Sequence, residues 1–168
     1  MLDKCLSKMT QTILFTTLLF FTFTISFAQT NSKKKNSMTI TLTKTINIKA
    51  SPDKVWDYVN DLSKWAEWAI HNVKSVRQGD NGFWLMDGPR GTSKVKMNSD
   101  KTTGILDHDF IDPGEGHWKV PCRVVAGNLG SHFMITFTKP EQMPDEAFEM
   151  GMKMLDEELL KLKENLEK

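Results

Sequence analysis

Apolar and polar side chains alternate along residues 39–50. Successive side chains of a β-strand point to opposite faces, so this pattern predicts a strand with one buried and one exposed side. Lys44 is the exception, because it falls on the apolar side. We expect either a bulge there or an amine that reaches solvent at a sheet edge, whereas an inward amine would orient a ligand. The apolar positions are Ile40, Leu42, Ile46 and Ile48.

Two short helices are predicted after this strand. Ser51 has the side chain of an N-cap, and Pro52 suits the first helical position. The first helix should span residues 52–60, and Asp61 can cap a second helix. Their apolar side chains are Val55, Trp56, Val59, Trp65 and Trp68.

Short apolar segments separated by turns rich in Gly, Asn and Asp occupy the middle of the chain. Such spacing predicts an antiparallel meander. The strands are expected at residues 72–78, 83–87, 93–98, 104–111, 117–126 and 131–139.

The chain closes with a helix predicted over residues 144–167. Its apolar positions recur every three or four residues and form one stripe, which would fit either core packing or a coiled-coil seam. Because a sheet with an unpaired inner face precedes the helix, we expect the stripe to pack on that sheet. The stripe consists of Phe148, Met152, Leu155, Leu159, Leu162 and Leu166.

Residues 1–28 have the layout of a secretory signal peptide. Lys4 and Lys8 precede the apolar run at residues 13–27, and Ser26-Phe27-Ala28 offers a cleavage site. The run is shorter than the roughly 20 apolar residues of a membrane span. We expect an exported, periplasmic or secreted protein with a signal at 1–28, a polar leader at 29–37 and one domain at 38–168. Translation from Met38 would instead give a cytoplasmic protein.

Charge and cysteine content exclude several classes of function. Without the first 28 residues the net charge of +1 falls to zero, so no basic field favours nucleic acid. Only Cys122 follows the signal, which rules out an internal disulfide. The four histidines show no metal-binding spacing, and no nucleophile or phosphate-loop motif is present. We therefore expect no metal, no cofactor and no stable membrane span in the mature chain.

The order of elements and several segments resemble a known superfamily. The segments are residues 48–56 (IKASPDKVW), 61–68 (DLSKWAEW), 104–108 (GILDH), 121–125 (PCRVV) and 157–163 (EELLKLK). The chain resembles the START-like or SRPBCC superfamily, which includes polyketide cyclases, lipid-transport proteins and birch-pollen allergens. The resemblance implies an α+β helix-grip fold, in which a curved antiparallel sheet of six to seven strands, with two short helices, wraps around one long C-terminal helix. It also implies a cavity between the sheet and that helix.

Alternation along the strands identifies the side chains that would line this cavity. Large aromatic and apolar residues on one face suit an apolar ligand, although they are equally typical of a packed core. The predicted ligand-binding residues are Trp68, Trp84, Leu106, His108, Phe110, Trp118, Val120, Phe133 and Met152.

His108 is the polar member of this set. Burying such a group without a partner costs about 1–3 kcal/mol, so it needs a hydrogen bond. A backbone carbonyl or neighbouring side chain would make it a structural residue. Alternatively, His108 orients a ligand or acts as an acid–base group.

These observations favour a binding protein that holds a lipid-like or aromatic ligand and works as a monomer or weak homodimer. One alternative is a cyclase or dehydratase that uses the same cavity, with His108 as its acid–base group. Another is a protein-interaction module like the related activator of a heat-shock ATPase.

A surface ion pair is also predicted. Counting outward from the turn at Glu115 places Asp107 opposite Arg123 on the polar outer face. Such a pair is exposed and contributes about 0.2–1 kcal/mol. Pro121 can shift this register, because it has no N–H for the sheet.

Overall fold

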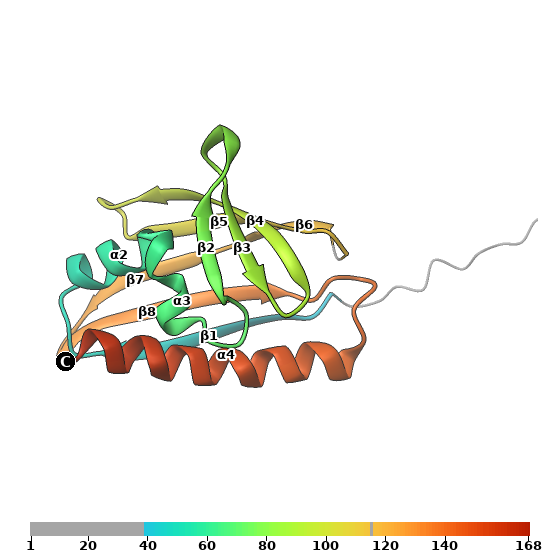
Figure 1. The fold of residues 1–168 in the computed structure, drawn as a ribbon. Helices are drawn as coiled ribbons and strands as arrows, with labels where there is room; N and C mark the ends of the chain where they lie inside the picture. Colours follow the sequence, from blue (N-terminus) through green and yellow to red (C-terminus); the bar gives the residue numbers. More distant parts are fainter. Residues whose placement is uncertain (1–38, 115) are drawn as a thin grey trace, which may run out of the picture. The chain divides into compact units, whose positions relative to one another are not determined.

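The computed structural model describes residues 39–114 and 116–168 (Figure 1). The signal, the leader and Met38 lie outside the described residues. The strands are β1 (Thr41–Ile48), β2 (Ser75–Gln78), β3 (Trp84–Gly88), β4 (Gly91–Asp100), β5 (Ile105–Asp112), β6 (Gly116–Val120), β7 (Cys122–Gly127) and β8 (Gly130–Thr138). The α-helices are α2 (Pro52–Asn60), α3 (Trp65–Trp68) and α4 (Asp145–Leu166), and short 3-10 turns occupy Leu62–Lys64 and Asp80–Gly82.

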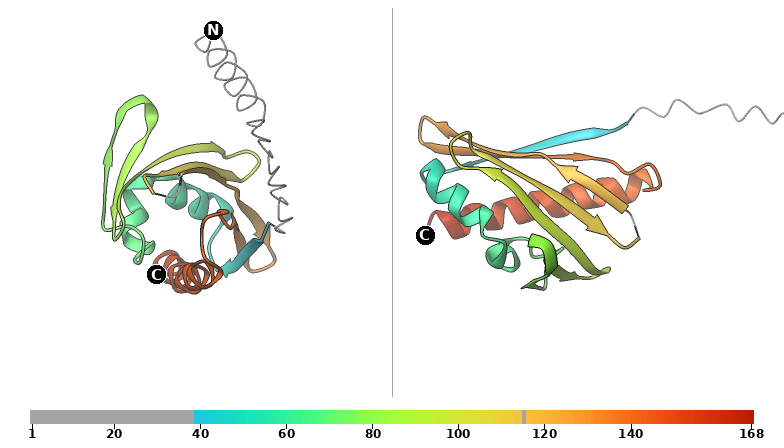
Figure 2. Two further views of the ribbon diagram at one scale, coloured as in Figure 1. Left: turned by 90° about the vertical axis from the view of Figure 1, so that its right-hand side faces the viewer. Right: turned by 90° about the horizontal axis from the view of Figure 1, so that it is seen from above.

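The strands form one antiparallel sheet in the order β1-β8-β7-β5-β4-β3-β2, with β6 paired to β5. The sheet curves over α4, and α2 and α3 cover one end of its concave side (Figure 2). The predicted α+β fold is therefore confirmed. Helix α2 has the predicted bounds because the Ser51 hydroxyl accepts a hydrogen bond from the N–H of Lys54 at 3.3 Å.

The predicted strand at 117–126 is wrong as a single element. It is divided at Pro121 into β6 and β7, both of which pair with β5. The predicted register is wrong as well, because Arg123 lies opposite Ile105 rather than Asp107.

The ion pair itself is present despite the shifted register. Asp107 binds the Arg123 guanidinium, and both side chains are partly exposed. Asp107 also accepts the N–H of Cys122 at 2.9 Å. Because Pro121 has no N–H to donate, this carboxylate supplies polar contacts where regular ladder pairing is interrupted.

Lys44 lies on β1, at one edge of the sheet. Its amine reaches out to Asp156 of α4, with 2.7 Å between Nζ and Oδ2. Lys44 is paired with Ile135 in a continuous β1–β8 ladder without a bulge. This residue therefore joins the edge strand to the last helix, consistent with an amine directed out of the apolar layer.

Candidate functional site

One cross-strand row of side chains crosses β3, β4, β5 and β6 on the inner face of the sheet. The register joins Trp84 to Val95, Val95 to Phe110 and Phe110 to Trp118. Val95 is fully buried, whereas the three aromatic residues are half-buried and pack against the core. The rings of Phe110 and Trp118 lie 5.1 Å apart between centroids. We call Trp84, Val95, Phe110 and Trp118 the aromatic row.

The neighbouring row contains His108, which pairs with Met97 on one side and Val120 on the other. His108 is buried, with Nδ1 3.4 Å from the carbonyl oxygen of Leu106. The Trp65 ring meets the imidazole edge-on at 5.0 Å. Burial lowers the pKa of His108 from 6.5 to about 4, so the ring is neutral at pH 7.

Cys122 lies beside His108, with Sγ 4.0 Å from Nδ1. Burial raises the pKa of this thiol well above its usual range. The thiol is therefore protonated at neutral pH and is a poor nucleophile. His108 and Cys122 together form a neutral, weakly polar centre.

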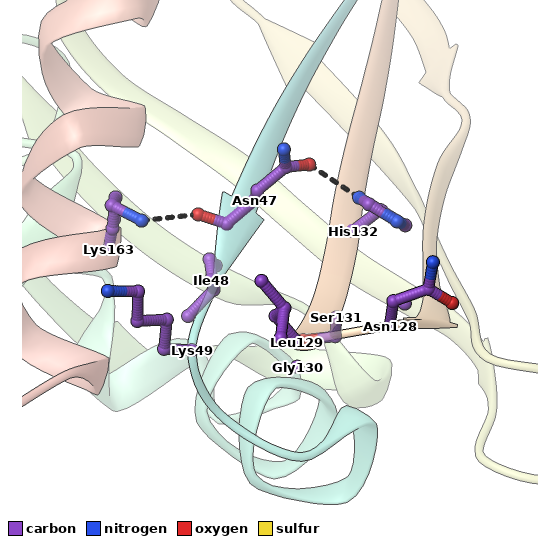
Figure 3. Close-up of a pocket in the computed structure, with 10 residues that line it drawn as sticks. Asn47, Ile48, Lys49, Asn128, Leu129, Gly130, Ser131, His132 and Lys163 are labelled. Atoms are coloured by element: carbon purple, nitrogen blue, oxygen red, sulfur yellow. Dashed lines mark hydrogen bonds between the residues drawn. The ribbon is translucent and has the colours of Figure 1, made fainter.

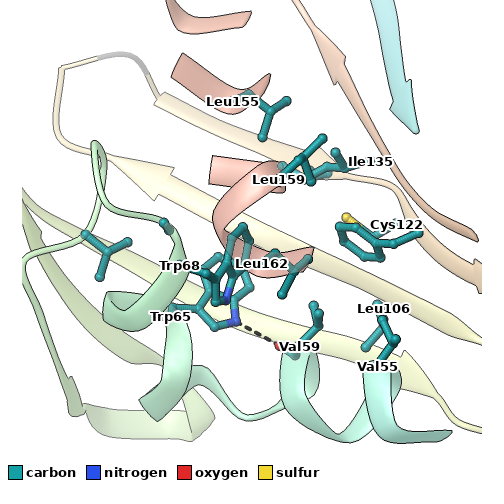
Figure 4. Packing of buried hydrophobic residues seen from close by; sticks show 14 of the residues in the cluster. Val55, Val59, Trp65, Trp68, Leu106, Cys122, Ile135, Leu155, Leu159 and Leu162 are labelled. Carbon is teal, nitrogen blue, oxygen red and sulfur yellow. Dashed lines mark hydrogen bonds between the residues drawn. The ribbon is translucent and has the colours of Figure 1, made fainter. Parts of the chain in front are cut away.

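The two tryptophans of α3 differ in their hydrogen bonding. The indole N–H of Trp65 donates to the carbonyl of Val59 at 2.8 Å (Figure 4). Trp68 lies alongside, with 5.3 Å between the ring centroids, and is only 3% exposed. Among the described residues, Trp68 Nε1 is the only buried side-chain nitrogen or oxygen without a hydrogen-bond partner.

Glu158 of α4 holds the segment that follows α3. Its carboxylate is buried and accepts the backbone N–H groups of His71 at 2.9 Å and Asn72 at 3.1 Å, as well as the Asn72 side-chain amide. Burial raises the pKa of Glu158, although these hydrogen bonds oppose the shift. Glu157, next to it, is exposed and pairs with His71 Nε2 at 2.7 Å.

The predicted ligand-binding residues all belong to one core or pack against it. The buried members are Trp68, Leu106, His108, Val120, Phe133 and Met152, and the half-buried members are Trp84, Phe110 and Trp118. The same core includes the whole apolar stripe of α4.

Sequence reasoning missed Trp65 as a neighbour of His108 and Glu158 as a buried group. Glu158 could have been found, because it follows Leu155 by three residues and therefore lies on the apolar stripe.

A separate pocket of about 340 Å³ lies where β1, the β7–β8 turn and α4 meet (Figure 3). None of the predicted residues lines it. Lys163 donates to the carbonyl of Asn47 at 2.6 Å, and His132 binds the Asn47 side chain. Because Lys163 is also paired with Glu167 at 2.7 Å, its charge is already compensated.

Within 39–114 and 116–168, no three His, Cys, Asp or Glu side chains gather as metal ligands. No helix in these ranges is long and apolar enough to cross a membrane.

Comparison with known proteins yields a family and a set of similar folds. Residues 39–167 match the family described as polyketide cyclase / dehydrase and lipid transport. No curated protein matched the sequence significantly.

Solved structures resemble the fold at low sequence identity. XoxI from Bacillus cereus is 14% identical with a TM-score of 0.60, and the match covers 75% of this chain and 94% of that chain. Ara h 8.0201 is 15% identical with a TM-score of 0.59, covering 76% and 97%. The Aha1 dimer from Colwellia psychrerythraea is 16% identical with a TM-score of 0.61, covering 76% and 96%.

Proposed function

The chain belongs to the polyketide cyclase / dehydrase and lipid transport family, and we propose that it is a binding protein that holds a small, largely apolar ligand between the sheet and α4. The family and the allergen-like neighbours support a ligand-binding fold. The nature of the ligand and the role as a carrier are the proposal.

The aromatic row is the observation that carries this proposal. Its three aromatic side chains are continuous with the core, yet each remains half-buried. Removing apolar surface from water contributes about 25 cal/mol per Å², so a ligand that covered these rings would gain substantial binding free energy. A lipid-like or aromatic molecule has the matching chemistry.

The chemistry of the neighbouring row favours binding over catalysis. An efficient acid–base group has a pKa near the working pH. His108 has a pKa of about 4 and is neutral, and the Cys122 thiol stays protonated. Both groups suit a weakly polar wall better than the acid–base step of a cyclase or dehydratase.

We extend the proposal to export. The signal-like pattern of residues 1–28 lies outside the described residues, so it rests on sequence alone. Cell fractionation and N-terminal sequencing should find a product that begins at Gln29 outside the cytoplasm. A cytoplasmic product that begins at Met38 would refute export and leave the ligand proposal intact.

Titration with the neutral fluorescent probe N-phenyl-1-naphthylamine tests the binding function. The wild type should bind the probe, and Trp118→Ala should weaken binding about ten-fold by removing part of the aromatic row. Leu129→Ala is the matched control, because Leu129 is an apolar side chain that is 85% exposed in the β7–β8 turn, away from this row.

Probe binding that is absent in the wild type, or lost equally in both variants, would contradict the proposal. If the proposal holds, native mass spectrometry of protein purified from its own host should identify the ligand as a co-purifying mass.

A further inference from the structure

We propose that the indole N–H of Trp68 anchors the polar end of the ligand, and that the ligand carries an uncharged hydrogen-bond acceptor such as a ketone, ester or ether oxygen. This inference rests on the proposed function and adds the chemical class of the ligand. It also assigns a position to the acceptor.

The first reason is the unpaired donor itself. Buried polar groups are nearly always hydrogen-bonded, and a buried donor without a partner is unfavourable. Trp68 Nε1 is such a donor, whereas the adjacent Trp65 has its N–H satisfied by Val59. The protein therefore supplies an acceptor to one of the two buried indoles on this short helix and leaves the other without one.

The second reason is a continuous path of rings from the half-buried margin to Trp68. Phe110 belongs to the aromatic row, and His108 precedes it on the same face of β5. The Trp65 ring lies 5.0 Å from His108 and 5.3 Å from Trp68. Because these rings pack against one another, a ligand whose apolar part covers the aromatic row must displace them to bring its polar end to the free N–H.

The third reason concerns charge, and it restricts the acceptor to an uncharged group. The centre next to Trp65 is a neutral imidazole and a protonated thiol. The buried carboxylate of Glu158 binds the backbone of His71 and Asn72, just after α3. Within the described part of the chain, the cation–ring contacts are at Phe83 and Trp56, not at these rings. A buried anionic ligand would find no cation in contact with the Trp65 or Trp68 ring and would be disfavoured there.

Three naphthalenes of similar shape test the inference. They are 2-acetylnaphthalene, which has a neutral acceptor; 2-ethylnaphthalene, which has none; and 2-naphthoate, which is an anion. Calorimetric titration of the wild type should show the ketone binding about five-fold more tightly than the hydrocarbon. The anion should bind more weakly than either.

Variants of the two tryptophans assign the effect to one N–H group. In Trp68→Phe, the ratio of ketone to hydrocarbon affinity should fall to about one. In Trp65→Phe, which removes the satisfied indole, the ratio should persist even if both affinities change.

A spectroscopic readout keeps the test decisive if Trp68→Phe folds poorly. In wild-type protein, the indole N–H resonance of Trp68 should shift on addition of the ketone and stay in place with the hydrocarbon. The carbonyl stretch of the bound ketone should move to lower frequency.

The outcomes separate this inference from the proposed function. Equal binding of ketone and hydrocarbon, with no indole shift, would overturn the anchor and preserve the binding function. Tighter binding of the anion would overturn the uncharged class. Failure of all three probes to bind would overturn both proposals.

Discussion

The interior of the domain has two ends that are built differently. At the sealed end, α2, α3 and the second half of α4 bury Val55, Val59, Leu162 and Leu166 almost completely. At the open end, the three aromatic side chains of the aromatic row, Trp84, Phe110 and Trp118, are left half-buried. The comparison shows that burial is nearly complete around α2 and the end of α4, whereas three aromatic side chains at the other end keep part of their apolar surface exposed.

Polar contacts reinforce the sealed end. The Lys54 amine donates to the carbonyl of Leu166 at 2.7 Å, which occupies an acceptor at the end of α4. Asn165 donates to the carbonyl of Glu67 at 3.0 Å and so joins α4 to α3. These contacts fix the helices around the sealed core independently of any ligand.

The first half of α4 is richer in flexible side chains than the second half. Met150, Met152 and Met154 are flexible and adapt to varied shapes. A Cβ added at Gly151 would meet no other atom within 4 Å, so there is open space beside this helix.

The largest expected effect contrasts one residue from each end. Leu162→Ala should lower the free energy of unfolding by about 2–5 kcal/mol, because it leaves a cavity in a fully buried site. Trp118→Ala should cost about 1–2 kcal/mol despite the larger side chain, because Trp118 is half-buried. Urea denaturation of the ligand-free protein measures both. Equal losses would mean that the open end is as tightly packed as the sealed end.

The pH dependence of stability tests whether His108, in the row next to the aromatic row, is buried away from solvent. Between pH 6.5 and about 4, the unfolded chain protonates His108 while the folded protein does not. The contribution of His108 is therefore complete above pH 6.5 and is lost as the pH falls, by about 3 kcal/mol at pH 4. His108→Phe should remove this component. Matching urea profiles for the two proteins across pH 4–7 would place His108 in contact with solvent.

The two adjacent glutamates of α4 provide a test variant at a buried position and a control variant at an exposed one. Glu158→Gln replaces the carboxylate that accepts the N–H groups of residues 71–72 with an amide. It should lower the free energy of unfolding by about 1–3 kcal/mol. Glu157→Gln alters an exposed pair and should change stability by no more than about 0.5 kcal/mol. Thermal unfolding at pH 7 compares the two. A larger loss from Glu157→Gln would show that the exposed pair, rather than the buried carboxylate, holds the segment after α3.

The sequence was sufficient for most of the elements, but not for burial along β1, where Ile40 and Leu42 are exposed although both were predicted on the buried side. Alternation in β1, the Ser51 cap of α2 and the stripe of α4 are local patterns, and each element formed as predicted. Local patterns cannot give a strand register across a residue that lacks an N–H. Pro121 therefore divided a predicted strand, and Arg123 shifted relative to Asp107.

The sequence also did not predict how deeply each inward-facing side chain is buried. Alternation indicates which face Leu106 and Phe110 occupy, yet one is fully buried and the other half-buried. The same holds for Trp65 and Trp68, whose hydrogen bonding depends on whether a carbonyl lies within reach of each indole. The predicted residues were thus brought to one core, but their separate roles required the structure.

The smallest expected effect probes the open space beside α4. Gly151→Ala should raise the free energy of unfolding by about 1 kcal/mol, because alanine favours the helix and the added methyl group meets no other atom. If a ligand occupies this space, the same methyl group should weaken binding of N-phenyl-1-naphthylamine. Ala147→Gly, at an exposed position one turn earlier, is the control for helix propensity and should lower stability without changing probe affinity. A loss of stability in Gly151→Ala would show that the first half of α4 is as closely packed as the second half.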